Sequence, residues 1–167
     1  IVVLVLSSVI GCSSLNINLP AVTDAPVAER QAGKIIWHDL ITNDIEGSKA
    51  FYGGLFGWEF EAIPIALGFG KSSNYLLIRK NGLLIGGMFN ATKLGSAENS
   101  SQWVVVMSVD DIDAVVENIT GAGGEILTPP TDLNERGRIA VVQDNAGALF
   151  ALLQTRDGDP PDTSAAF

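Results

Sequence analysis

The chain has 167 residues, of which 47% are hydrophobic and 17% charged, a composition typical of a folded domain rather than of a disordered segment. Its formal net charge is −9, so it lacks the basic face that binding to nucleic acid or to an anionic lipid surface requires. One cysteine and one histidine exclude an intrachain disulfide, a cysteine metal cluster and any metal site built from two histidines.

Residues 1–11 are apolar and uncharged. They are too few for a transmembrane helix, which needs about 20 residues, but they have the length of the hydrophobic region of a signal peptide. The run VIGC at 9–12 resembles a bacterial lipobox, in which the cysteine becomes lipidated, and Ser13 fits outer-membrane sorting. The alternative is a short anchor or buried strand with an incidental cysteine. We therefore expect a signal peptide over 1–11 and a lipoprotein anchored through Cys12 in the cell envelope, with the outer membrane favoured.

Three further regions follow from composition. Residues 12–33 are rich in Ser, Asn, Pro and Thr and show little periodicity, which predicts a tether behind the lipidated cysteine. Residues 34–155 hold the periodic segments of one folded domain. Residues 156–167 include DGDPPD, which predicts a flexible tail.

The first half of the domain predicts one helix and four strands. We expect strands at 34–42, 58–63, 74–79 and 83–89 and a helix that begins near residue 45 and ends before Gly57. Asn43 or Asp44 can cap this helix, because a short polar side chain accepts a hydrogen bond from a free backbone N–H. The pair Asn81 and Gly82 predicts a tight hairpin, since both residue types tolerate positive φ. The helix is expected to direct three side chains toward the core: Phe51, Tyr52 and Leu55.

The second half repeats this order after a polar linker at 90–101. We expect strands at 102–109, 125–127, 138–143 and 148–154, with a loop at 128–136. Asp110 or Asp111 can cap the second helix. Its apolar stripe at spacing i, i+3, i+4, i+7 consists of Ile112, Val115, Val116 and Ile119. The pattern β-α-β-β-β therefore occurs twice.

Eight short motifs lie in a characteristic order along residues 34–154. They are WHDLITND at 37–44, FY at 51–52, FGW at 56–58, VDDID at 109–113, AGG at 122–124, PPT at 129–131, GR at 137–138 and DNAG at 144–147. Together they resemble the vicinal oxygen chelate superfamily, which includes glyoxalase I, bleomycin-resistance proteins and extradiol dioxygenases. The resemblance implies an α+β fold in which two βαβββ modules form an open, glyoxalase-like barrel around a cleft.

The resemblance also implies where catalytic members of the superfamily hold a divalent metal. The four positions fall on Trp37, residues 86–88, Val104 and Ala151, and none of these side chains can ligate a metal. His38 is one residue away from the first position, and a strand turns that neighbour to the opposite face unless a bulge intervenes. We therefore expect no metal and no other cofactor, which puts the lyase and ring-cleaving reactions in doubt.

Strand alternation predicts which side chains line the cleft. They are Trp37, Asp39 and Ile41 from the first strand, Val104 and Val106 from its counterpart, and Ala151 with Leu153 from the last strand. This apolar surface with one carboxylate suits an apolar or cationic small molecule. The alternative is that Trp37 and Trp103 only fill the core. Asp39 lacks a partner for general-base catalysis, and Arg138 either meets an anionic ligand or pairs with a surface carboxylate.

The sequence thus favours a membrane-anchored protein, similar to glyoxalases and bleomycin-resistance proteins, that binds a small molecule without a catalytic metal. Whether it is an enzyme stays open, with the balance toward none. The alternatives are a metal-dependent lyase or dioxygenase of the same superfamily and an interaction domain with a vestigial cleft. We expect a membrane contact through the lipid anchor, no nucleic-acid partner, and a homodimer as one possible assembly.

Overall fold

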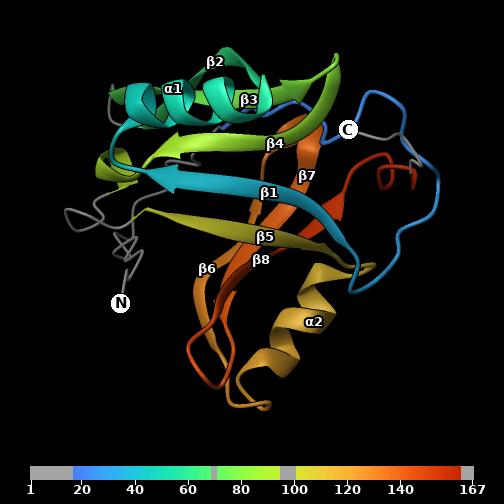
Figure 1. The fold of residues 1–167 in the computed structure, drawn as a ribbon. Coiled ribbons are helices and arrows are strands. Elements are labelled where there is room, and N and C mark those ends of the chain that lie inside the picture. The colour runs from blue at the N-terminus through green and yellow to red at the C-terminus, as the bar shows by residue number, and fades with distance from the viewer. Residues whose placement is uncertain (1–16, 69–70, 95–100, 163–167) are drawn as a thin grey trace.

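The computed structural model describes residues 17–68, 71–94 and 101–162; the expected signal peptide and Cys12 lie outside them. Within this range, one mixed sheet of eight strands carries two helices on the same face (Figure 1). No helix of the described part of the chain has the length and hydropathy needed to cross a bilayer.

The strands occur as two sets of four. They are β1 Ile35–Thr42, β2 Glu59–Gly68, β3 Lys71–Lys80, β4 Leu83–Asn90, β5 Gln102–Ser108, β6 Glu125–Asp132, β7 Gly137–Gln143 and β8 Leu149–Thr155. Their order in the sheet is β2-β3-β4-β1-β5-β8-β7-β6. The two modules meet where β1 pairs antiparallel with β5, while β1–β4 and β5–β8 are the parallel pairs. The α+β class and the repeated βαβββ order predicted from the sequence are confirmed.

Local signals in the sequence set the ends of the helices and the first hairpin. Helix α1 (Ile45–Phe56) begins after Asp44, whose Oδ1 accepts a hydrogen bond from the Gly47 backbone N–H at 2.9 Å. Helix α2 (Ile112–Ile119) is capped in the same way by Asp111. Asn81 and Gly82 join β3 to β4 with φ of 52° and 81°, as the hairpin prediction requires. Two short 3₁₀ turns, η1 (Ala91–Leu94) and η2 (Asn134–Arg136), precede β5 and β7.

Prolines lie in both edge strands of the sheet. Strand β6 continues through Pro129 and Pro130, a region that the sequence predicted to be loop. The opposite edge strand, β2, contains Pro64. An edge strand has one side without a partner, so a residue that lacks an N–H need not break the ladder. The edge position of β6, which the sequence did not reveal, explains why the strand tolerates two prolines.

The two helices pack differently on the convex face of the sheet. Ile112 of α2 is fully buried, and the predicted stripe packs beside it against β7 and β8. Helix α1 buries no residue completely. Phe51 is 61% exposed and Leu55 59% exposed, so the prediction that both face the core is wrong. Of its apolar side chains, Ile45 and Tyr52, seven residues apart and hence on one side of the helix, pack against the sheet.

The segments before and after the predicted domain pack against it. Val27 and Asp159 form an antiparallel bridge, and the fully buried Asp159 carboxylate accepts hydrogen bonds from the Gln31 backbone N–H at 2.8 Å and from the Thr155 hydroxyl at 3.1 Å. The described parts of the expected tether (12–33) and tail (156–167) are therefore integral to the fold. Composition indicated loops here, and it could not show that the two loops would pair with one another.

Candidate functional site

The side chains predicted to line the cleft share the concave face of the sheet, opposite the helices. Trp37, Val106 and Ala151 belong to one buried cluster, and Ile41 and Val104 belong to a second. Asp39 lies between them and is partly buried. Leu153, the seventh residue predicted to line the cleft, belongs to the same cluster as Trp37, so alternation placed all seven on one face. The structure adds that the six apolar side chains are covered, Trp37 being only 2% exposed.

A set of hydrogen-bonded polar side chains, which we call the polar group, lies in the middle of this apolar face. The Tyr75 hydroxyl, on β3, donates to Asp39 Oδ1 at 2.6 Å, and the Trp37 indole N–H lies 3.0 Å from both the Tyr75 and the Asp39 oxygens. Burial and the neighbouring Asp39 carboxylate raise the pKa of Tyr75, so the phenol stays neutral and keeps its proton for Asp39. Three residues from two strands thereby hold one another in fixed positions.

Arg136, the last residue of η2, completes this polar group. Its Nη1 donates to the Tyr75 hydroxyl oxygen at 2.9 Å and its Nε to the Pro20 carbonyl oxygen at 2.9 Å. The guanidinium carbon lies 5.0 Å from the centre of the Trp37 ring and 4.9 Å from that of Tyr75, which is cation–π geometry. Arg136 therefore covers the Trp37 face on which an apolar or cationic ligand was expected, and its charge opposes a cationic one.

The superfamily's metal positions do not fit a metal ion in this chain. The second metal position lies on β4, where Gly87 pairs with Asp39 of β1. A Cβ built on Gly87 would overlap the Tyr75 hydroxyl and Asp39 Oδ1. A ligating side chain at this position would therefore displace the polar group. The other three positions carry an indole or an aliphatic side chain, and the nearby guanidinium is cationic. In the described residues, no three His, Cys, Asp or Glu side chains are arranged to hold a metal.

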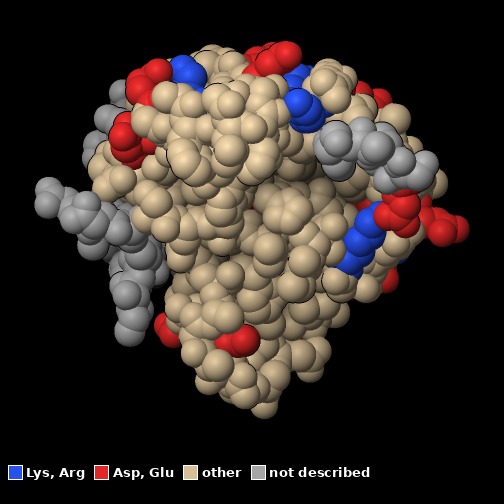
Figure 2. Space-filling model, in the orientation of Figure 1, with Lys and Arg blue, Asp and Glu red and all other residues tan. Residues whose placement is uncertain are grey.

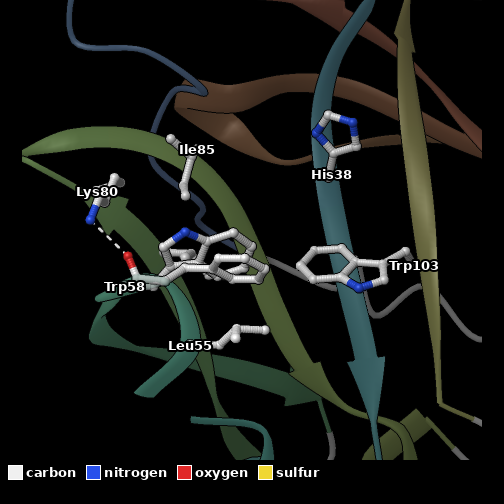
Figure 3. Close-up of a pocket in the computed structure, with 8 residues that line it drawn as sticks. His38, Leu55, Trp58, Lys80, Ile85 and Trp103 are labelled. Carbon is white, nitrogen blue, oxygen red and sulfur yellow. Dashed lines mark hydrogen bonds between the residues drawn. The ribbon is translucent and has the colours of Figure 1, made fainter. Parts of the chain in front are cut away.

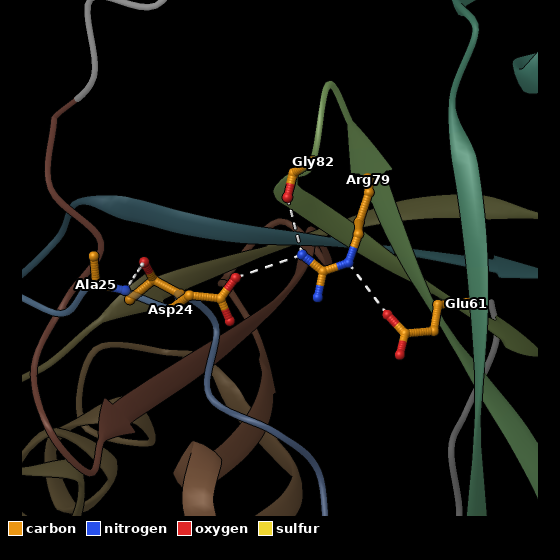
Figure 4. Close-up of polar contacts among 6 residues, drawn as sticks. Asp24, Ala25, Glu61, Arg79 and Gly82 are labelled. Carbon is orange, nitrogen blue, oxygen red and sulfur yellow. Dashed lines mark hydrogen bonds and ion pairs between the residues drawn. The ribbon is translucent and has the colours of Figure 1, made fainter.

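Residues 17–22, which we call the strap, cover the polar group. Leu19 and Val22 insert into the same buried cluster as Trp37. The backbone of the strap bonds to the η2 region: Leu19 N–H donates to Leu133 O at 3.3 Å, and Arg136 N–H donates to Leu19 O at 3.1 Å. Just downstream, Asp24 faces Arg79, which also contacts Glu61 (Figure 4). The strap thus closes the cleft with the chain's own side chains.

His38 lies on the opposite face, as alternation predicted. It is exposed and lines an open cavity of about 670 Å³ between α1 and the sheet. Trp58 and Trp103 project into this space beside Leu55 (Figure 3). Trp103 is 40% exposed, so it does not fill the core, and its indole N–H donates to the Tyr52 hydroxyl at 3.0 Å. We call Tyr52, Phe56, Trp58 and Trp103 the convex aromatic cluster.

Arg138 pairs with a surface carboxylate, one of its two predicted roles. Its Nη1 and Nη2 lie 2.6 Å and 2.9 Å from the two oxygens of Asp113 on α2. This hydrogen bonding with Arg138 lowers the pKa of Asp113. Arg136 makes no ion pair with any carboxylate of the described residues. Arg138, the arginine considered from the sequence, therefore has its partner at the surface. Arg136, two residues earlier, is the arginine that points into the cleft.

Sequence reasoning missed Tyr75, Arg136 and the strap. Tyr75 alternates with Leu77 in a strand, a pattern that predicts a face but not which β1 residue it meets. Arg136 lies in a segment predicted as loop, where an arginine is ordinarily exposed. The adjacent Gly137, with φ of 107°, was the available sign of a constrained turn. Nothing in residues 17–22 indicated that they would enter the cleft.

The same architecture occurs in solved structures. A methylmalonyl-CoA epimerase in complex with methylmalonyl-CoA and NH₄⁺ aligns with a TM-score of 0.54 and 18% identity, over 78% of this chain and 100% of that chain. A Mn(II)-bound glyoxalase from Novosphingobium aromaticivorans aligns with a TM-score of 0.50 and 16% identity, over 81% of this chain and 44% of that chain. At these identities the similarity establishes a shared fold.

Sequence comparison identifies the family. The profile of the Glyoxalase/Bleomycin resistance protein/Dioxygenase superfamily matches residues 34–152, and the chain belongs to that superfamily. "Putative glyoxylase CFP32" of Mycobacterium tuberculosis is 31% identical over 74% of this chain and 45% of its own length. The anthracycline biosynthesis protein DnrV of Streptomyces peucetius is 30% identical over 72% of this chain and 46% of its own length. The chain thus spans about half the length of the curated relatives it matches.

Proposed function

We propose that this chain is a glyoxalase-fold protein that binds a small molecule in the cleft without a catalytic metal. The observation that carries the proposal is the polar group of Asp39, Tyr75 and Arg136 at the place where the superfamily's metal positions converge. A buried guanidinium without a carboxylate partner costs stability. Clusters of this kind are more common at binding and catalytic sites than in a purely structural core.

A melting-temperature panel tests this proposal, because a molecule that binds only the folded state raises the melting temperature. The panel uses one ring with three head groups: cyclohexanecarboxylate, cyclohexanecarboxamide and cyclohexylammonium. We expect at least one to stabilise the chain, and the shift to disappear in Tyr75→Phe. Tyr52→Phe is the matched control, since its hydroxyl also accepts from an indole N–H but on the other face.

Two results would contradict the proposal. The first is the absence of any shift with all three head groups, at concentrations up to the solubility of each. The second is a shift that survives Tyr75→Phe and disappears in Tyr52→Phe. That result would place the ligand in the cavity between α1 and the sheet, which Trp58 and Trp103 line.

The convex face supports a second candidate function, an interface for another glyoxalase-like unit. Phe51, Leu55, Phe56 and Trp103 are exposed large apolar side chains. The centre of this face has few charged residues, and most of the charge lies at its rim (Figure 2). On a chain with a net charge of −9, such a face is where two copies can approach with little repulsion. The curated relatives, about twice as long, have room for a second unit in one chain.

Sedimentation equilibrium tests the interface. We expect the unmodified chain to self-associate and Leu55→Glu to be monomeric, because a carboxylate cannot be buried without a partner. Glu117→Gln on the exposed side of α2 is the control and should leave the association unchanged. A monomeric unmodified chain at 100 micromolar or above would contradict this candidate.

The membrane anchor is a further part of the proposed function, and the VIGC run at 9–12 is its support. We expect the chain, expressed in a bacterium and exported from the cytoplasm, to incorporate labelled palmitate. Cys12→Ser should abolish the label and release the protein from the membrane fraction. Equal labelling of both proteins would contradict the anchor.

A further inference from the structure

Arg136 carries an unused donor inside the protein. The residue is 2% exposed, and its Nη2 has no hydrogen-bond partner among the described residues. Leaving a buried charged donor unpaired costs more than leaving an exposed one, because no water compensates for it. The other two nitrogens are occupied by the Tyr75 hydroxyl and the Pro20 carbonyl.

The arrangement of these partners matches half of a carboxylate site. Nε–H and the adjacent Nη2–H of an arginine point in the same direction along one edge, the edge that binds both oxygens of a carboxylate. The Pro20 carbonyl oxygen accepts from Nε, 2.9 Å away, and no atom of the described residues accepts from Nη2. A neutral carbonyl therefore lies where one carboxylate oxygen would bind, and the described part of the chain places no acceptor at the second oxygen position.

We propose that Arg136 is the binding residue for a small-molecule carboxylate, which takes the place of the Pro20 carbonyl on the Nε/Nη2 edge when the strap moves away. The inference rests on the proposed function, and it names the ligand class for that cleft. The hydrogen bond from Arg136 Nη1 to the Tyr75 hydroxyl oxygen is retained, and it holds the guanidinium plane in place during the exchange. Asp39 does not compete for the carboxylate's position, because the Tyr75 hydroxyl and the Trp37 indole already donate to its Oδ1.

The contacts of the strap are suited to such an exchange. Its attachment to η2 consists of individual hydrogen bonds, from backbone and side-chain donors, each of which has a small net effect on stability, and of the burial of Leu19 and Val22. The apolar part of a ligand can replace those two side chains. Trp37 also lines a cavity of about 250 Å³ together with Val22 and Ile36, so space for an apolar group adjoins the strap. A carboxylate on a compact apolar body therefore fits better than a highly polar anion.

The test uses isothermal titration calorimetry of the full chain with cyclohexanecarboxylate, and with cyclohexanecarboxamide as the neutral analogue of the same shape. In the strap variant Leu19→Ser/Val22→Ser, we expect the carboxylate to bind at least tenfold more tightly than in the unmodified chain. Adding Arg136→Gln should weaken this binding at least tenfold. Adding Arg138→Gln should not change it, because that arginine is exposed and already paired with Asp113.

A second measurement needs no variant and applies if the strap variant does not fold. Hydrogen exchange of the Leu19 and Arg136 backbone amides, which bond across the strap, should speed up with cyclohexanecarboxylate and not with the amide. Equal binding of acid and amide, binding that survives Arg136→Gln, or unchanged exchange would each overturn the inference. If the carboxamide or cyclohexylammonium binds through Tyr75 while the carboxylate does not, the result supports the proposed function and overturns the inference that the ligand is a carboxylate.

Discussion

Two tryptophan–tyrosine pairs lie on opposite faces of the central strands. Trp37 on β1 donates to the Tyr75 hydroxyl, and Trp103 on β5 donates to the Tyr52 hydroxyl, each at 3.0 Å. The concave pair is buried and joined to a carboxylate and a guanidinium. The convex pair is partly exposed and surrounded by other aromatic rings, with Trp58 stacked on Tyr52 at 5.3 Å between centroids. The same contact thus belongs to a polar site on one face and to an apolar surface on the other.

The largest effect expected from this difference concerns Gly87. A Cβ here overlaps the Tyr75 hydroxyl and Asp39 Oδ1, so Gly87→Ala has to push the polar group apart. We expect the free energy of unfolding to fall by about 3 kcal/mol. Gly54→Ala in α1 is the control: nothing lies within 4 Å of its Cβ, and alanine favours the helix by about 1 kcal/mol. Urea denaturation measures both, and equal stability of the two variants would contradict the structure of the concave site.

The two tyrosine hydroxyls provide the next comparison. Tyr75→Phe leaves Arg136 Nη1 and one Asp39 contact unpaired in a buried place, and we expect a loss of about 2 kcal/mol. Tyr52→Phe exposes the Trp103 N–H to water, which can replace the lost acceptor, so the loss should be below about 1 kcal/mol. The same urea series measures these values. Equal losses would mean that the two pairs do not differ as described.

The smallest effect concerns the exposed arginine. Because Arg138 lowers the pKa of Asp113, the pair stabilises the fold above the ordinary carboxyl pKa, and this contribution is lost as the pH falls through the lowered value. In Arg138→Gln we expect the Asp113 pKa to return toward its ordinary range, as followed by carboxyl NMR titration. The pKa of Asp144, lowered by the Ala148 and Ala146 backbone N–H groups, should stay where it is. An unchanged Asp113 pKa would contradict the pairing.

Strand alternation and capping residues predicted the fold because both are local. Asp44 and Asp111 begin their helices, Asn81 with Gly82 forms the hairpin, and the motifs at 37–44 and 109–113 mark the two modules. The facing of α1 was mispredicted for Phe51 and Leu55, because the large apolar side chains of this helix form a wide stripe and the sheet covers only the part that carries Ile45 and Tyr52.

The centre of the cleft depends on contacts between distant parts of the chain. Arg136 meets Tyr75 from 61 residues away and Pro20 from 116 residues away. No periodicity relates such positions, and a single sequence contains no other record of their contact. For the same reason the sequence predicted an open cleft for an apolar or cationic ligand, whereas the structure shows a covered cleft that already contains its own cation.

Metal analysis tests the central claim most directly, namely that an arginine-centred polar group replaces the metal site of the superfamily. The full chain is incubated with Zn²⁺, Ni²⁺, Mn²⁺ or Fe²⁺, dialysed and analysed by mass spectrometry of the elements. We predict no near-stoichiometric metal, because the four positions offer no donors and Arg136 opposes a cation. Near-stoichiometric metal that Asp39→Asn or His38→Ala releases would contradict the account and restore the metal-dependent lyase or dioxygenase as the function to test.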